Sequence, residues 1–145
     1  MKDPKLLFHY ISYLQYPFLL IGLYYVCKPY WEGFDGAFQS LNTALIFMGL
    51  GISLSTLQDT RKTQNKVSKQ IWEHPTKGKV ALAFMSGTTL FFILFGLYHY
   101  FAVDQNVLKE LSFGMIVLGI GLIGLLKAAI EMFENHRLDK KDTTE

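Results

Sequence analysis

The sequence predicts an all-α integral membrane protein with four transmembrane helices, arranged as two antiparallel hairpins. The first observation is where the 14 basic and 12 acidic residues fall among the 145. Three apolar stretches contain none of them and a fourth contains one; the stretches are Leu6–Cys27, Ala37–Leu57, Val80–Val103 and Leu111–Ile130. The second observation is length, because each stretch is close to the roughly 20 apolar residues that cross a bilayer core. A soluble bundle keeps a polar face on every helix, so a soluble domain is excluded.

The composition of the whole chain hides this pattern. With 50% hydrophobic residues, 18% charged residues and a net charge of +2, the chain resembles a small soluble domain until its charges are placed. The one cysteine, Cys27, excludes an internal disulfide. Bulky residues precede it where a signal-peptide or lipoprotein cleavage site needs small ones, so we expect the first apolar stretch to be retained as a helix.

The first hairpin is expected over residues 1–57. Proline cannot continue the hydrogen-bond ladder of a helix, so we expect Lys28-Pro29 to end the first transmembrane helix. Pro17, in the middle of that helix, leaves the carbonyl of Tyr13 without a donor and predicts a kink. Tyrosines and Gln15 beside the kink form a face that could bind a lipid or a quinone, while packing at the membrane interface explains the same tyrosines.

The middle of the chain, residues 58–79, forms a basic loop that we expect to be partly helical. Its first part, Gln58–Trp72, contains no glycine or proline, so the second transmembrane helix is expected to continue into it. Residues 80–130 form the second hairpin, and residues 131–145 form a polar tail.

The basic residues predict the orientation in the membrane. Residues 1–5, 58–79 and 131–145 carry eleven of the 14 basic residues, and with four spans these three regions lie on one side. Loops rich in lysine and arginine stay in the cytoplasm. We therefore expect a multi-pass protein of the cell membrane, of the bacterial inner-membrane kind, with both termini in the cytoplasm.

The two hairpins resemble each other in sequence. Phe18–Tyr25 aligns with Phe92–His99, and Met48–Ile52 aligns with Leu118–Leu122 around a shared Gly-x-Gly. If the resemblance reflects duplication, the repeats are parallel and are related by an axis along the membrane normal. Apolar helices also share residues by chance, so both explanations stay open.

Glycines predict which helices pack together. Lipid provides no hydrophobic drive for helix association, so close approach of backbones at small residues matters. The second and fourth transmembrane helices carry the glycines and are expected to form the central pair. The stripe that begins at Gly114 continues to Glu131 and is expected to aim that carboxylate at the bundle. The predicted packing glycines are Gly49, Gly51, Gly114, Gly119, Gly121 and Gly124.

Few polar side chains lie inside the spans, and ionisable ones there are candidates for function. Lys127 and Glu131 are four residues apart on one helix, where they form either an ion pair that fixes the depth of the helix or an ion or proton site. Asn42 and Thr56, on the second transmembrane helix, either bond between helices or line a polar pathway. These four residues are the candidate ion or proton site.

The basic loop predicts contact with anionic lipid headgroups through Arg61, Lys62, Lys66 and Lys69. Nucleic-acid binding is not expected, because the patch is small and has no interleaved aromatic residues. The sequence contains no catalytic or metal-binding motif, so neither an enzyme nor a cofactor is expected.

These observations favour a structural or accessory subunit of a homo- or hetero-oligomeric membrane complex, whose partners are the bilayer and either itself or another membrane protein. The alternative is a homo-oligomeric ion channel or small-solute transporter, since four helices are too few to enclose a pore alone. A quinone- or lipid-binding membrane enzyme module is the third hypothesis.

Overall fold

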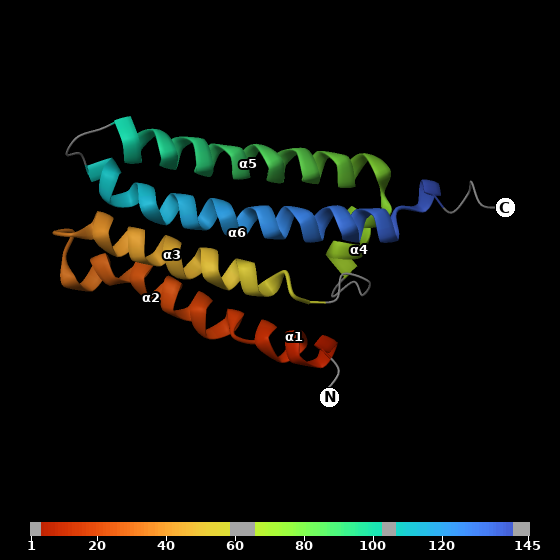
Figure 1. Cartoon of the computed structure of the whole chain (residues 1–145), viewed down its shortest axis with the longest axis horizontal. Helices are drawn as coiled ribbons and strands as arrows, with labels where there is room; N and C mark the ends of the chain where they lie inside the picture. The colour runs from red at the N-terminus through yellow and green to blue at the C-terminus, as the bar shows by residue number, and fades with distance from the viewer. Residues whose placement is uncertain (1–3, 59–65, 103–106, 141–145) are drawn as a thin grey trace.

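The computed structural model describes residues 4–58, 66–102 and 107–140, and within these ranges the chain is helical with no strand. Four helical stretches are long and apolar enough to cross a membrane, which confirms the predicted fold class: Leu6–Glu32, Ala37–Ser55, Pro75–Ala102 and Leu108–His136. Figure 1 shows the helices, which are α1 (Pro4–Ser12), α2 (Gln15–Glu32), α3 (Ala37–Ser55), α4 (Lys66–Glu73), α5 (Pro75–Ala102) and α6 (Val107–His136), followed by a 3₁₀ turn at Leu138–Lys140.

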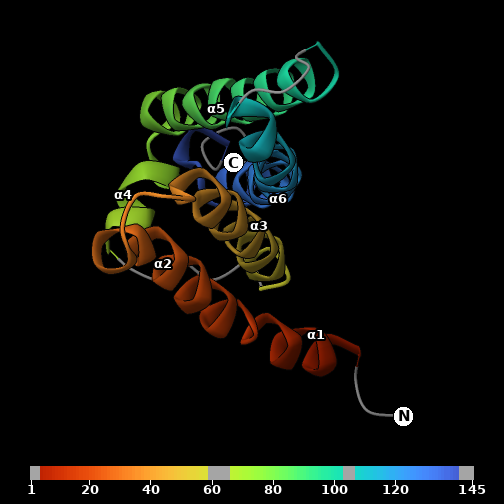
Figure 2. The same cartoon turned by 90° about the vertical axis from the view of Figure 1, so that its left-hand side faces the viewer.

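The long helices lie side by side as an open row in the order α2, α3, α6, α5 (Figures 1 and 2). The most extensive contact is between α3 and α6, as expected for the central pair, and the next two are α2 with α3 and α5 with α6. Helices α2 and α5 lie at opposite edges of the row. We call the end that carries both chain termini and α4 the terminal end, and the end with the α2–α3 turn the hairpin end (Figure 1).

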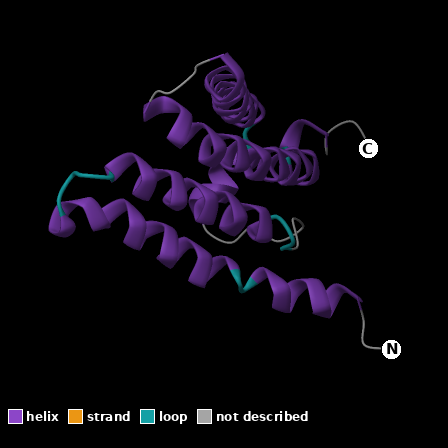
Figure 3. Ribbon diagram, turned by 60° about the vertical axis from the view of Figure 1, so that its left-hand side comes forward, coloured by secondary structure: helices purple, strands orange, loops and turns teal. Residues whose placement is uncertain are grey.

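The first span is broken between α1 and α2, as Figure 3 shows. Because Pro17 has no N–H, the carbonyl of Tyr13 accepts from the N–H of Tyr16 instead, at 3.2 Å. The N–H of Leu14 likewise bonds three residues back to Ile11, at 3.0 Å. These tight turns are the predicted kink, one turn before the proline.

The prediction that Lys28-Pro29 ends the first transmembrane helix is wrong, because α2 continues to Glu32. The carbonyl of Pro29 accepts from the N–H of Gly33 at 3.2 Å, and an ion pair of 3.3 Å joins Lys28 to Glu32 across the same turn. The helix ends where Gly33 takes a positive φ of 97°, a conformation that favours glycine.

The second transmembrane helix does not continue into the basic loop, since α3 ends at Ser55. The hydroxyls of Ser55 and Thr56 donate to the carbonyls of Ile52 and Ser53, at 2.6 and 2.7 Å. Such bonds from side chain to backbone compete with the regular ladder and favour helix ends. The predicted loop of residues 58–79 contains α4, and α5 already begins at Pro75, a residue suited to the first turn of a helix.

Five of the six predicted packing glycines face another helix, and the sixth, Gly124, faces Thr56, the residue that follows α3. Residues two apart on a helix point about 200° apart, so each Gly-x-Gly serves two neighbours. In α3, Gly49 faces the backbone of α6, while Gly51 faces Leu19 of α2. In α6, Gly121 faces the backbone of Gly49, while Gly119 faces Ile93 of α5.

The two hairpins also contain equivalent internal contacts. Gly22 approaches the carbonyl of Ala44, and Gly96 approaches the carbonyl of Ser112, in each case from the first helix of a hairpin to the second. The two glycines are 74 residues apart, as in the aligned sequences, but their partners are 68 apart where the alignment has 70. A duplication followed by a slide of two residues fits these contacts, and the duplication itself stays a prediction.

Gly121→Ala is expected to lower the free energy of unfolding by about 1–3 kcal/mol, because its methyl group would overlap the backbone of Gly49 and force α3 and α6 apart. The measurement is unfolding in mixed micelles with a denaturing detergent. Gly124→Ala on the same helix is the control, since the nearest atom to its methyl group is a side-chain methyl of Thr56 at 3.3 Å. Equal losses in the two variants would contradict the prediction.

Candidate functional site

A cavity of about 460 Å³ lies at the terminal end, among α2, α3, α4, α5 and α6. We call it the terminal cavity. Its volume is within the range of small-molecule sites. One part of its wall is apolar, with Leu19, Leu125 and Met132 among its side chains. The other part can form hydrogen bonds, and its residues are Gln15, Ser55, Thr56, Gln58, Ser68 and Trp72.

The cavity exists because α3 stops before α6 does. Gly124 packs against Thr56 immediately after the end of α3, and α6 then continues to His136. The short helix α4 covers the gap, where the hydroxyl of Ser68 donates to the sulfur of Met132 at 3.6 Å. The break in the first span leads directly into Gln15, the first residue of α2.

Gln15 is the most unusual residue of this wall. It is 7% exposed, and its side-chain amide forms no hydrogen bond within the described ranges. Among the described side chains, Arg137 Nε is the one nitrogen or oxygen that is both sealed from solvent and without a hydrogen bond. The amide of Gln15 therefore reaches accessible space, and the terminal cavity is the space that it lines.

The other polar side chains of the described wall are also uncharged. The hydroxyls of Ser55 and Thr56 donate to carbonyls of their own helix, so their oxygens stay able to accept a hydrogen bond. Trp72 adds an indole ring with a single donor. Among the residues that the structure describes, no lysine, arginine, aspartate or glutamate lines the cavity.

Lys127 and Glu131 lie outside this cavity. Their ion pair measures 3.8 Å, and their side chains are 80% and 49% exposed. The expectation that Glu131 points into the bundle is wrong, because α3 has already ended before that level of α6. Lys127 follows Phe113 and Ile120 at seven-residue intervals on the exposed face of α6.

Asn42 holds the two central helices together near the hairpin end. Its side-chain oxygen accepts from the backbone N–H of Gly114 at 2.7 Å. From Gly114 to Glu131 the helix rises by about 25 Å, so Asn42 lies far from the terminal end. The four candidate ion-site residues therefore do not converge within one chain.

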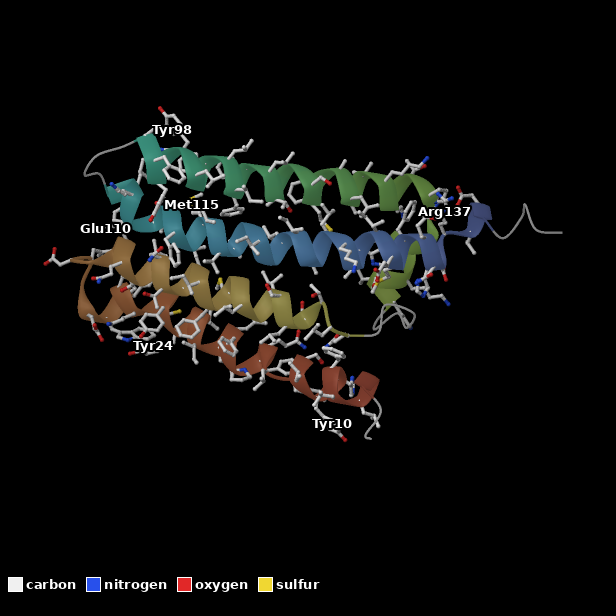
Figure 4. The ribbon with its side chains drawn as sticks, viewed as in Figure 1. Tyr10, Tyr24, Tyr98, Glu110, Met115 and Arg137 are labelled. Carbon is white, nitrogen blue, oxygen red and sulfur yellow. The ribbon has the colours of Figure 1, made fainter. Side chains whose placement is uncertain are left out.

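Of the predicted headgroup contacts, Arg61 and Lys62 lie outside the described residues. Lys66 and Lys69 lie on α4 and are exposed, and Lys69 forms an ion pair of 3.6 Å with Glu73. Arg137 also lies at the terminal end, at the opposite end of α6 from Glu110 (Figure 4), and it forms ion pairs with Glu134 at 3.3 Å and Asp139 at 3.7 Å.

Most tyrosines of the first span face outward, whereas Tyr25 stacks on Phe47 of α3. Figure 4 shows Tyr10 and Tyr24 projecting from the outer side of α1 and α2, and Tyr16 is also exposed although it borders the cavity. The face beside the kink is therefore divided, with its tyrosines outside and Gln15 inside. No group of three metal-ligating side chains occurs in the part of the chain that the structure describes.

Comparison with protein-family models, with curated proteins and with solved structures finds no match to this chain. The function must therefore be inferred from the residues themselves. Sequence reasoning placed Gln15 on an aromatic face and Trp72 in the basic loop, and did not bring them together. One feature of the sequence could have singled out Gln15 as a site residue: it is the one asparagine or glutamine in Leu6–Cys27.

Asn42→Ala is expected to lower the free energy of unfolding by about 0.5–1.5 kcal/mol, because it removes the acceptor for the Gly114 N–H. Unfolding in mixed micelles measures the loss. Thr43→Ala is the control, since that hydroxyl bonds within its own helix, to the carbonyl of Gln39 at 3.0 Å. An Asn42→Ala protein as stable as the control would show that the bond contributes nothing.

Proposed function

We propose that the chain is a structural or accessory subunit of a homo- or hetero-oligomeric membrane complex, and that it assembles through the outer face of α5. The observation that carries this proposal is Gly87. At nine of the ten glycines inside the described helices, a β-carbon would lie within 4 Å of an atom from another segment of the chain, whereas at Gly87 it would meet open space.

A glycine inside a helix costs about 1 kcal/mol relative to alanine. At the other nine positions, close contact with another segment of the chain offsets that cost. Among the described residues no such contact is present at Gly87, so we infer that the offsetting contact there is with another chain. Ala83 precedes it by one turn, which gives the small-xxx-small spacing of membrane helix interfaces. Phe84, Thr88 and Phe91 surround Gly87 and form a notch of about 330 Å³.

The open row of helices supports the same proposal. Helix α5 is at the edge of the row, and among the described long helices its main neighbour is α6. Its outer face is apolar and exposed, with Phe84 at 76%. A partner helix on this face would extend the row without disturbing the central pair.

We also propose that the terminal end faces the cytoplasm of a bacterial inner membrane. Eleven of the 14 basic residues belong to the three regions at this end, and lysine and arginine are retained on the cytoplasmic side. The bilayer and its anionic headgroups are then the partners of α4, through Lys66 and Lys69.

In a Cys27→Ser background, a membrane-impermeant maleimide added to intact cells is expected to label Phe34→Cys and not Leu138→Cys. Both positions are exposed, the first in the α2–α3 turn and the second after α6. Permeabilised cells, where both variants should react, provide the control for accessibility. Labelling of Leu138→Cys alone in intact cells would reverse the proposed orientation.

Gly87→Leu is expected to weaken assembly at least tenfold, since its side chain fills the notch that a partner helix would enter. The measurement is the mass of the particle extracted from native membranes into polymer nanodiscs. Ile120→Phe is the control, because it adds bulk to an exposed side chain on α6 instead. A wild-type particle that contains one copy and no other protein, or an assembly unchanged by Gly87→Leu, contradicts the proposal.

A further inference from the structure

We propose that the terminal cavity binds an uncharged amphiphile, with a carbonyl- or hydroxyl-bearing head held by Gln15 and an apolar tail on the α2–α6 side of the wall. This proposal is independent of assembly through α5, because it rests on a different part of the molecule.

The first argument is the amide of Gln15, which has no hydrogen-bond partner within the described ranges. The side chain offers two donors and one acceptor. The residue is 7% exposed, and its amide atoms are not sealed but reach the terminal cavity that Gln15 lines. A group bound in the cavity would therefore complete the hydrogen bonds that the described chain leaves open.

The second argument concerns charge. Burying an anion or a cation without a partner of opposite charge is strongly unfavourable, and the described wall of the cavity carries no charged side chain. The nearby ion pair of Lys127 and Glu131 is exposed outside it. The described wall therefore suits a neutral head better than a phosphate.

The third argument concerns shape. Gln15 is the first residue of α2, directly after the break in the first span. Beside it, Leu19, Leu125 and Met132 supply an apolar wall next to the hydrogen-bonding one. A small polar head joined to a hydrocarbon or isoprenoid tail satisfies both walls at once, and a quinone and a diacylglycerol share this chemistry.

The test uses Trp72 as a reporter inside the wall. The chain has two tryptophans, and Trp31→Phe removes the one in the last turn of α2, at the hairpin end. In nanodiscs of this single-tryptophan protein, decylubiquinone is expected to quench the fluorescence of Trp72 saturably. In a second arm, dioctanoylglycerol is added to the quenched sample and its ability to restore the fluorescence is measured.

The two arms identify the source of the ligand. Saturable quenching that dioctanoylglycerol does not reverse supports a quinone, and a stabilising shift in the melting temperature with dioctanoylglycerol alone supports a glycerolipid. Absence of both effects overturns the proposal. Stabilisation by phosphatidylglycerol alone also overturns it, because that ligand is charged.

Gln15→Leu separates binding from folding. It is expected to weaken binding of the effective probe at least tenfold, while the melting temperature without probe stays equal or rises. Gln39→Leu, which changes an exposed glutamine near the hairpin end of α3, is the matched control and should bind as the parent does.

Ala128→Leu fills the cavity from α6 and leaves the glutamine at position 15 in place, so it should also abolish binding even if Gln15→Leu fails to fold. Probe binding that persists in either folded variant shows that the probe sits elsewhere in the bilayer. In that case water completes the hydrogen bonds of Gln15, and the cavity holds no amphiphile.

Discussion

The backbone contact between Gly49 and Gly121 is the constraint on which this fold depends. Lipid tails are as apolar as the side chains, so burying an apolar side chain between two helices in a bilayer gains little free energy. Helices therefore associate where their backbones come close. The buried hydrophobic side chains of the described chain are few, and four of the five lie on α6: Ala44, Met115, Leu118, Ala129 and Phe133. The neighbouring glycines Gly51 and Gly119 then attach α2 and α5 to this central pair.

The unequal lengths of the two central helices shape the terminal end. Hydroxyl groups end α3 at Ser55, whereas α6 continues to His136. The space left beside α6 is bordered by α4 and by the first helix after the break in the first span, so segments distant in sequence line one cavity. The hollow beside the central pair thus originates in a short α3 packed against a long α6.

Much of this architecture could be predicted from the sequence, and the exceptions share a cause. Charge-free stretches depend on local composition alone, so the spans can be predicted from the sequence. The Gly-x-Gly spacing determines which faces of a helix lack side chains, so the packing glycines can be predicted as well. Helix α2 ends at Glu32 because Gly33 takes a positive φ, and α3 ends at Ser55 where hydroxyl groups bond to the backbone. These local effects outweigh the proline at position 29 and the lack of glycine and proline after residue 57, on which the predicted ends were based. The exposure of Glu131 and the burial of Gln15 depend on where another helix stops, and no periodicity within one segment contains that information.

The end of α3 also gives the cavity an electrical polarity. The aligned peptide dipoles of a helix leave about half a negative charge at its C-terminus, and for α3 that terminus is at Ser55 and Thr56, on the cavity wall. Among uncharged heads of equal size, one that offers hydrogen atoms to this wall would therefore be held more firmly than one that offers only lone pairs. A molecule that alternates between hydroxyl and carbonyl forms would be bound more tightly in its reduced state.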